Sequence, residues 1–177
     1  MRGINERYES NRRLLGPYTG YICNQCAEPA ARLRYGRLGN ISGMGCGPAA
    51  AYNVLKRLGE SMDFPEVIRR FEELGIPRAG ALLGSKRFRI GAFFNSVNIP
   101  YKKYTSAKEF IGALPGGRIA IISSWNNGMR GTHFYCVYYS KASQRYWSMN
   151  YRCDSSRPRP FALSEISPYR FIVGYVF

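Results

Sequence analysis

The stretch Pro115-Gly-Gly-Arg-Ile-Ala-Ile-Ile-Ser-Ser-Trp125 separates two kinds of sequence. Before it, apolar residues recur at the spacing of an amphipathic helix, whereas after it short runs rich in aromatic and β-branched residues are typical of strands. Residues 115–117 stop the last helix, and residues 118–125 form the first strand. Helices followed by strands predict an α+β fold, in which N-terminal helices pack on a mostly antiparallel sheet.

Four helices are expected on the N-terminal side of this stretch. The first begins near Cys46, carries Pro48 in its opening turn, where a missing N–H does no harm, and ends at Gly59. The other three are expected at residues 63–74, 90–97 and 106–114. Two of them begin with capping patterns, which are Asp63-x-x-Glu66 and Ser106-x-x-Glu109.

On the C-terminal side we expect a turn at residues 126–128 and further strands at residues 132–139, 144–150 and 169–177. The first of these strands holds the only histidine of the chain, His133. Because side chains alternate along a strand, His133 and Tyr135 share one face, while Phe134 and Cys136 lie on the other. Cys136 is therefore expected to be structural.

The loop between two of these strands predicts a pairing. If residues 140–143 connect the two strands as a hairpin loop, Asn150 lies directly opposite His133, on the same face of the sheet. We expect that face to point toward Cys46. The side-chain oxygen of Asn150 would then accept a hydrogen bond from one ring nitrogen of His133.

Composition and charge limit the class of protein. A length of 177 residues with 45% hydrophobic residues suits one globular domain. We expect residues 1–38, which are weakly periodic, to form an extension packed on a domain of residues 39–177. No run reaches the length of a signal peptide or membrane span, so a soluble, cytoplasmic protein is expected. The net charge of +15 is spread among apolar residues, which does not favour a dedicated nucleic-acid partner.

The five cysteines are expected to be reduced, because their number is odd and no export signal is seen. Cys23-x-x-Cys26 resembles half of a zinc or redox site. A second pair or a nearby histidine is absent from the sequence, so ordinary thiols are favoured and no metal or cofactor is expected.

Cys46 and His133 together are the components of a cysteine nucleophile and its base. A helix N-terminus stabilises a thiolate by at most about 2 kcal/mol, whereas an imidazolium roughly 4 Å away gives about 4 kcal/mol at an effective dielectric constant of about 20. The histidine therefore matters more than the helix. The alternative for Cys46 alone is a small, buried apolar residue.

An acyl-transfer site also needs donors for a developing oxyanion. The backbone N–H of Cys46 is one candidate, and the side-chain amide of Asn40, six residues earlier, is the second. Gly43 and Gly45 between them allow a substrate backbone to approach closely. Trp125 is a further residue that could form a wall of the cleft.

These motifs together resemble the papain-like cysteine peptidases, in particular the bacterial branch similar to peptidases that remove double-glycine leaders from bacteriocins. The resemblance rests on the order amide, Cys, His, Asn, on the spacing of six from Asn40 to Cys46, and on Gly-Thr-His133-Phe and Trp147-Ser-Met-Asn150. It implies a papain-like catalytic domain over residues 39–177. The implied roles are nucleophile for Cys46, base for His133, orienting residue for Asn150 and oxyanion donor for Asn40.

The function expected from the sequence is hydrolysis of a peptide or protein substrate through a thioester intermediate. Two alternatives stay open. An acyltransferase or transglutaminase-like enzyme would use the same residues with an amine in place of water. A non-catalytic module would keep the fold and bind through its basic surface.

Overall fold

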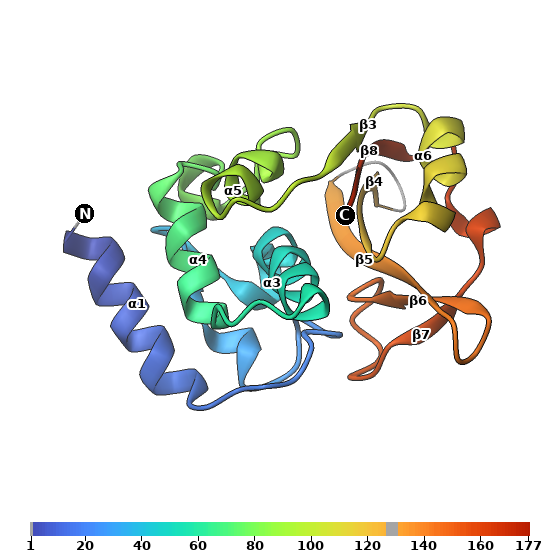
Figure 1. Cartoon of the computed structure of the whole chain (residues 1–177). Coiled ribbons are helices and arrows are strands. Elements are labelled where there is room, and N and C mark those ends of the chain that lie inside the picture. Colours follow the sequence, from blue (N-terminus) through green and yellow to red (C-terminus); the bar gives the residue numbers. More distant parts are fainter. Residues whose placement is uncertain (1, 127–130) are drawn as a thin grey trace.

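The expected division into helices and strands is present in the structure, a computed structural model that describes residues 2–126 and 131–177 (Figure 1). The helices are α1 (Arg2–Leu15), α2 (Ile41–Met44), α3 (Cys46–Leu58), α4 (Phe64–Glu73), α5 (Ile90–Ser96) and α6 (Ala107–Ala113), with short 3₁₀ helices at Ala30–Arg32, Ala79–Ala81, Leu114–Gly116 and Leu163–Glu165. The strands are β1 (Arg34–Tyr35), β2 (Gly39–Asn40), β3 (Lys102–Tyr104), β4 (Ala120–Trp125), β5 (Thr132–Ser140), β6 (Arg145–Met149), β7 (Arg159–Phe161) and β8 (Phe171–Val176). The α+β class is confirmed.

The predicted helices begin and end where their local signals lie. Helix α3 starts at Cys46 and stops at Gly59, whose φ of 87° is a left-handed conformation that favours glycine. The carboxylate of Asp63 accepts a hydrogen bond from the N–H of Glu66 at 2.7 Å, and Ser106 caps α6 in the same way. Capping signals of this kind act within one helical turn, which is why the sequence alone locates them.

Six of the strands form one antiparallel sheet in the order β3-β8-β4-β5-β6-β7, and β1 and β2 form a separate hairpin. The edge strands β3 and β7 were not predicted, because each has only three residues and too short a pattern to recognise. The turn expected at residues 126–128 lies largely outside the described residues.

Helices cover both faces of this sheet (Figure 1). On one face, α3 packs against β5, and the residues buried there include Ala50, Phe134 and Cys136. On the other face, α6 packs against β8, and a second core contains Phe110 and Tyr135. The alternation predicted for β5 is thus confirmed, since Phe134 and Cys136 lie on the α3 face and Tyr135 lies on the α6 face.

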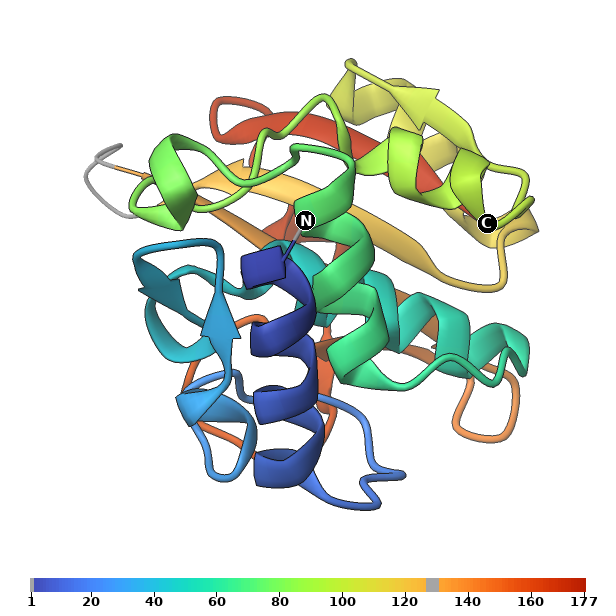
Figure 2. The ribbon, with the colours of Figure 1, turned by 90° about the vertical axis from the view of Figure 1, so that its left-hand side faces the viewer.

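Residues 2–38 contribute to the core on the α3 side. Helix α1, which the sequence did not predict, packs along α4, as Figure 2 shows with α1 in front. Arg7 and Glu72 form an ion pair of 2.6 Å between these two helices. Leu15, Ile22 and Leu33 are buried in the same cluster as α3. No helix in residues 2–126 and 131–177 is long and apolar enough to cross a membrane.

The predicted pairing of His133 with Asn150 is wrong. The hairpin pairs Ser140 with Arg145 and Cys136 with Met149, so the loop is residues 141–144 and the register is shifted by two residues. Gln144 takes a left-handed φ of 49°, which lets this loop close one residue later at each end than expected. A shift of two leaves every side chain on its predicted face, but β6 ends at Met149, before it reaches His133.

The expectation of five reduced cysteines is also wrong for one pair, because Cys26 and Cys153 form a disulfide with their Cα atoms 5.7 Å apart. The two are 127 residues apart in sequence. They meet because the segment around Cys23 runs beside the end of β6, where the N–H of Asn150 donates to the carbonyl of Cys23 at 2.9 Å. Cys23, Cys46 and Cys136 are free thiols.

Candidate active site

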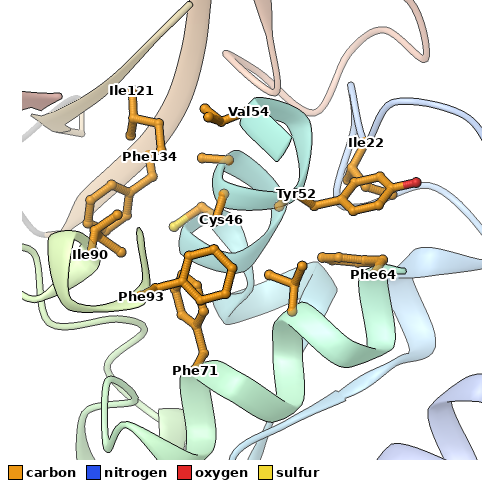
Figure 3. Close-up of a cluster of buried hydrophobic side chains, with 14 of the residues drawn as sticks. Ile22, Cys46, Tyr52, Val54, Phe64, Phe71, Ile90, Phe93, Ile121 and Phe134 are labelled. Atoms are coloured by element: carbon orange, nitrogen blue, oxygen red, sulfur yellow. The ribbon is translucent and has the colours of Figure 1, made fainter. Parts of the chain in front are cut away.

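Cys46 opens helix α3 and lies largely buried, with 7% of its surface exposed. Figure 3 shows its sulfur among the side chains of Ile90, Phe93 and Phe134. The next residue, Gly47, leaves little room for a side chain, because a Cβ atom there would lie only 2.5 Å from the hydroxyl of Ser85. The start of α3 therefore packs closely on the segment that contains Ser85.

Burial raises the pKa of the Cys46 thiol above its usual range. The backbone N–H groups of Phe134, Gly47 and Cys46 itself act in the opposite direction, since each can hydrogen bond to the sulfur and favours the thiolate. Burial is the larger influence. At rest Cys46 is a neutral thiol that is surrounded by donors able to stabilise negative charge.

A cavity of about 460 Å³ lies next to Cys46. Its walls come from three regions of the chain, and they include Met44, Cys46, Ser85, Arg87, Trp125 and Phe134. The hydroxyl of Ser85 is already 2.7 Å from that of Tyr35. Cys46 is the only one of the three free cysteines that lines this cavity.

His133 lies on the other face of β5 from Cys46, so the prediction that its face points toward Cys46 is wrong. Its ring is stacked near that of Tyr135, with centroids 6.2 Å apart. The face that packs on α3 is the one with Phe134 and Cys136, and the Cys136 thiol lies 3.2 Å from the carbonyl of Ala50. His133 lines a second cavity of about 270 Å³ together with Tyr151 and Arg152.

The imidazole of His133 is held by the main chain of Asn150. Its Nε2 atom lies 2.5 Å from the Asn150 carbonyl oxygen, which can only accept a hydrogen bond. The proton must therefore be on Nε2, and Nδ1 of the neutral ring keeps its lone pair. Burial lowers the pKa of His133, whereas the carbonyl of Asn150 raises it to a smaller extent. Among the described residues, no hydrogen bond joins this ring to the thiol of Cys46.

The side chain of Asn150 has a different partner from the one predicted. Its oxygen accepts from the N–H of Gln25 at 3.0 Å, and its amide donates to the side-chain oxygen of Gln25 at 2.8 Å. The main chain at Asn150 takes a φ of 58°, which directs its carbonyl to His133. The predicted bond from the Asn150 side chain to His133 is therefore replaced by one from its carbonyl.

Gln25 is a site residue that the sequence analysis missed. Besides Asn150, its amide donates to the carbonyls of Ile41 and Ser42 at 3.0 and 2.9 Å. It thus links the chain just before α3 to the residue that holds His133. No local pattern marks such a role, because the partners are 16 to 125 residues away in sequence.

Asn40 is not brought to Cys46. Its side chain is exposed and caps α2, where its oxygen accepts from the N–H of Gly43 at 2.9 Å. It is also absent from the described residues that line the cavity at Cys46. Of the two predicted oxyanion donors, only the backbone N–H of Cys46 therefore remains.

The two cavities have two of the described residues in common. Trp125 and Asn126, at the end of β4, line both the cavity of Cys46 and the cavity of His133. Thr132 and Phe134, the chain neighbours of His133, line the cavity of Cys46. Trp125 thus forms a wall of the site, as the sequence analysis considered. The nucleophile candidate and the base candidate lie on two sides of this wall.

Within residues 2–126 and 131–177, no group of His, Cys, Asp and Glu side chains is arranged to hold a metal ion. No protein-family model matches the chain, and no curated protein is significantly similar to it.

Proposed function

We propose that this protein is a papain-like cysteine peptidase, in which Cys46 is the nucleophile and His133 the general base. The observation that carries the proposal is the pair of cavities that share Trp125 and Asn126 as lining residues, one with Cys46 and the other with His133. A peptide that crosses from one cavity to the other would place its acyl part beside the thiol and its leaving amine beside the imidazole. Acyl transfer requires this arrangement.

The first step starts from neutral partners. Burial disfavours both the thiolate of Cys46 and the imidazolium of His133, so proton transfer accompanies attack. Nδ1 of His133 takes the thiol proton while the sulfur bonds to the peptide carbonyl carbon. Catalytic hydrogen bonds are often long or poorly aligned before substrate binds. Because His133 rests on the other face of β5, this proposal requires its side chain to turn toward Cys46 when substrate binds. Backbone N–H groups around Cys46 stabilise the negative charge that develops.

The later steps return the enzyme to its starting state. The imidazolium gives its proton to the leaving nitrogen as the carbon–nitrogen bond breaks, which leaves a thioester on Cys46. Water then attacks the thioester with its proton taken by Nδ1, and the acid product and the free thiol are released. In the resting enzyme the carbonyl of Asn150 accepts from Nε2–H, which fixes the tautomer that leaves Nδ1 free to act as the base.

The test is intact-mass analysis of the full chain incubated with pools of synthetic peptides. We expect cleaved peptides and a transient mass increase on Cys46, both absent from Cys46→Ala. Cys23→Ala is the matched control, because Cys23 is also a buried free thiol but does not line the Cys46 cavity. Peptides joined to an added amine would identify an acyltransferase instead. If Cys46→Ala cleaves peptides as well as the natural chain does, the proposal is wrong.

A further inference from the structure

The cavity beside Cys46 is positively charged. Arg78 and Arg87 line it, and its described lining residues include no Asp or Glu. Elsewhere many arginines are paired with carboxylates, as Arg7 is with Glu72 and Arg69 with Glu66. Among the described residues, neither Arg78 nor Arg87 forms such an ion pair. Arg78 and Arg87 therefore line the cavity without a carboxylate partner among the described residues.

Contacts at the side chain and at the backbone of Arg87 hold this residue in place. Its guanidinium lies over the ring of Trp125, 4.8 Å from the centroid, and its backbone carbonyl accepts from the hydroxyl of Tyr175 at 3.0 Å. A cation–π contact uses no N–H donor of the guanidinium, whose planar fork can bind a carboxylate through two parallel hydrogen bonds. Trp125 also lines both cavities.

Arg78 begins a tightly folded loop that forms another part of the wall. Its N–H donates to the carbonyl of Gly84 at 2.8 Å, and its carbonyl accepts from Ala81 at 2.9 Å. Ala79 and Ala81 both have positive φ values, 47° and 75°, conformations that alanine rarely takes. The N–H of Leu38 from the β1–β2 hairpin donates to Gly80 at 2.9 Å and fastens the loop from outside.

The same loop supplies apolar surface at the cavity. Leu82 and Leu83 line it and are 51% and 60% exposed. Exposed leucines beside unpaired arginines make a surface that suits a ligand with both apolar groups and a negative charge.

We propose that this cavity selects the acyl side of the substrate, and that it binds peptides with a glutamate or aspartate, next to apolar residues, on the N-terminal side of the cleaved bond. The inference rests on the proposed function. It adds a substrate class and assigns Arg87 and Arg78 as the residues that determine it.

The test measures binding rather than cleavage, and it uses the Cys46→Ala chain so that no substrate is consumed. The probes are two sets of leucine-containing hexapeptides that differ only in carrying glutamate or glutamine at one position. By calorimetry at low salt, we expect the best glutamate peptide to bind roughly tenfold or more tightly than its glutamine counterpart. Added salt should reduce this difference.

Variants of the arginines identify the source of the preference. Arg87→Gln should abolish the glutamate advantage and Arg78→Gln should reduce it. Arg89→Gln is the matched control, because it removes the same charge from an exposed neighbour that does not line the cavity. Far-ultraviolet circular dichroism checks that each variant is folded.

Two results would overturn the inference. One is equal binding, or no binding, of the glutamate and glutamine sets at every position. The other is an advantage that survives in Arg87→Gln and Arg78→Gln, or that falls equally in Arg89→Gln. These results are independent of the peptidase proposal. A Cys46 that never forms a thioester would refute the proposed function while leaving a measured glutamate preference in place.

Discussion

His133 is held by the backbone carbonyl of Asn150, whereas the side chain of Asn150 is bonded to Gln25. The orienting hydrogen bond of the candidate base therefore depends on the main-chain conformation at residue 150. That conformation is fixed by a residue 125 positions earlier in the chain. Loss of the Asn150 side chain would act on His133 only through this main-chain position.

The pair Gln25 and Asn150 is predicted to be strongly coupled in stability. Asn150→Ala leaves buried groups of Gln25 without partners, which costs about 1–3 kcal/mol for each such group. Urea unfolding of both single alanine variants and the double variant should give a coupling energy of about 1 kcal/mol or more. Asn40→Ala is the control: it removes an exposed helix cap, costs about 1 kcal/mol and should add to Asn150→Ala. Additive effects of Gln25→Ala and Asn150→Ala would refute the contact.

Stability is predicted to fall with decreasing pH because of His133. Burial lowers its pKa below the ordinary value of 6.5, so the folded protein binds fewer protons than the unfolded chain below that pH. The contribution of the neutral His133 ring to the free energy of unfolding is complete above pH 6.5, and it is lost as the pH falls through the lowered pKa. His133 is the only histidine, so His133→Gln should flatten the curve of unfolding free energy against pH in this range. An unchanged slope in the variant would contradict the assignment.

Gly47→Ala is predicted to disturb the start of α3. The added Cβ would meet the hydroxyl of Ser85 at 2.5 Å and its Cβ at 2.9 Å, so that Ser85 must move away from Tyr35. Overpacking of this kind costs about 1–3 kcal/mol. In α6, the Cβ added by Gly112→Ala would meet no atom within 4 Å, so this variant should instead raise the free energy of unfolding by up to about 1 kcal/mol. Thermal unfolding compares the two, and Ser85→Gly should partly rescue Gly47→Ala. Equal melting temperatures for both glycine variants would show that the contact is not tight.

The disulfide determines how many cysteines a thiol reagent can modify. In denaturant without a reductant, iodoacetamide should modify three cysteines, which are Cys23, Cys46 and Cys136. With a reductant it should modify all five. Burial raises the pKa of all three thiols. In the folded protein Cys46 should still react first, because it lines the cavity of about 460 Å³, which a small reagent can enter, and Cys23 and Cys136 do not line this cavity. Five modified residues without a reductant would show that Cys26 and Cys153 are not joined.

The parts of this fold that the sequence predicts are those with short-range signals. The capping residues Asp63 and Ser106 act within one turn, and alternation along β5 separates Tyr135 from Phe134. The hairpin register was predicted wrongly because a four-residue loop was expected at residues 140–143 and lies at residues 141–144. Nothing in these polar residues distinguishes the two loop positions. Which face of the sheet α3 covers, the Gln25–Asn150 pair and the disulfide all depend on contacts between distant segments. Such contacts leave no periodic pattern in a single sequence.

Cys46 and His133 are proposed to act as one unit in acyl transfer, and the rates of single and double variants test this. On a peptide that the natural chain cleaves, Cys46→Ala and His133→Ala should each lower kcat by about a thousandfold or more. The double variant should be hardly slower than either one, because the second change removes a function that is already lost. Additive losses in the double variant, or full activity in His133→Ala, would show that the two residues do not act together in catalysis.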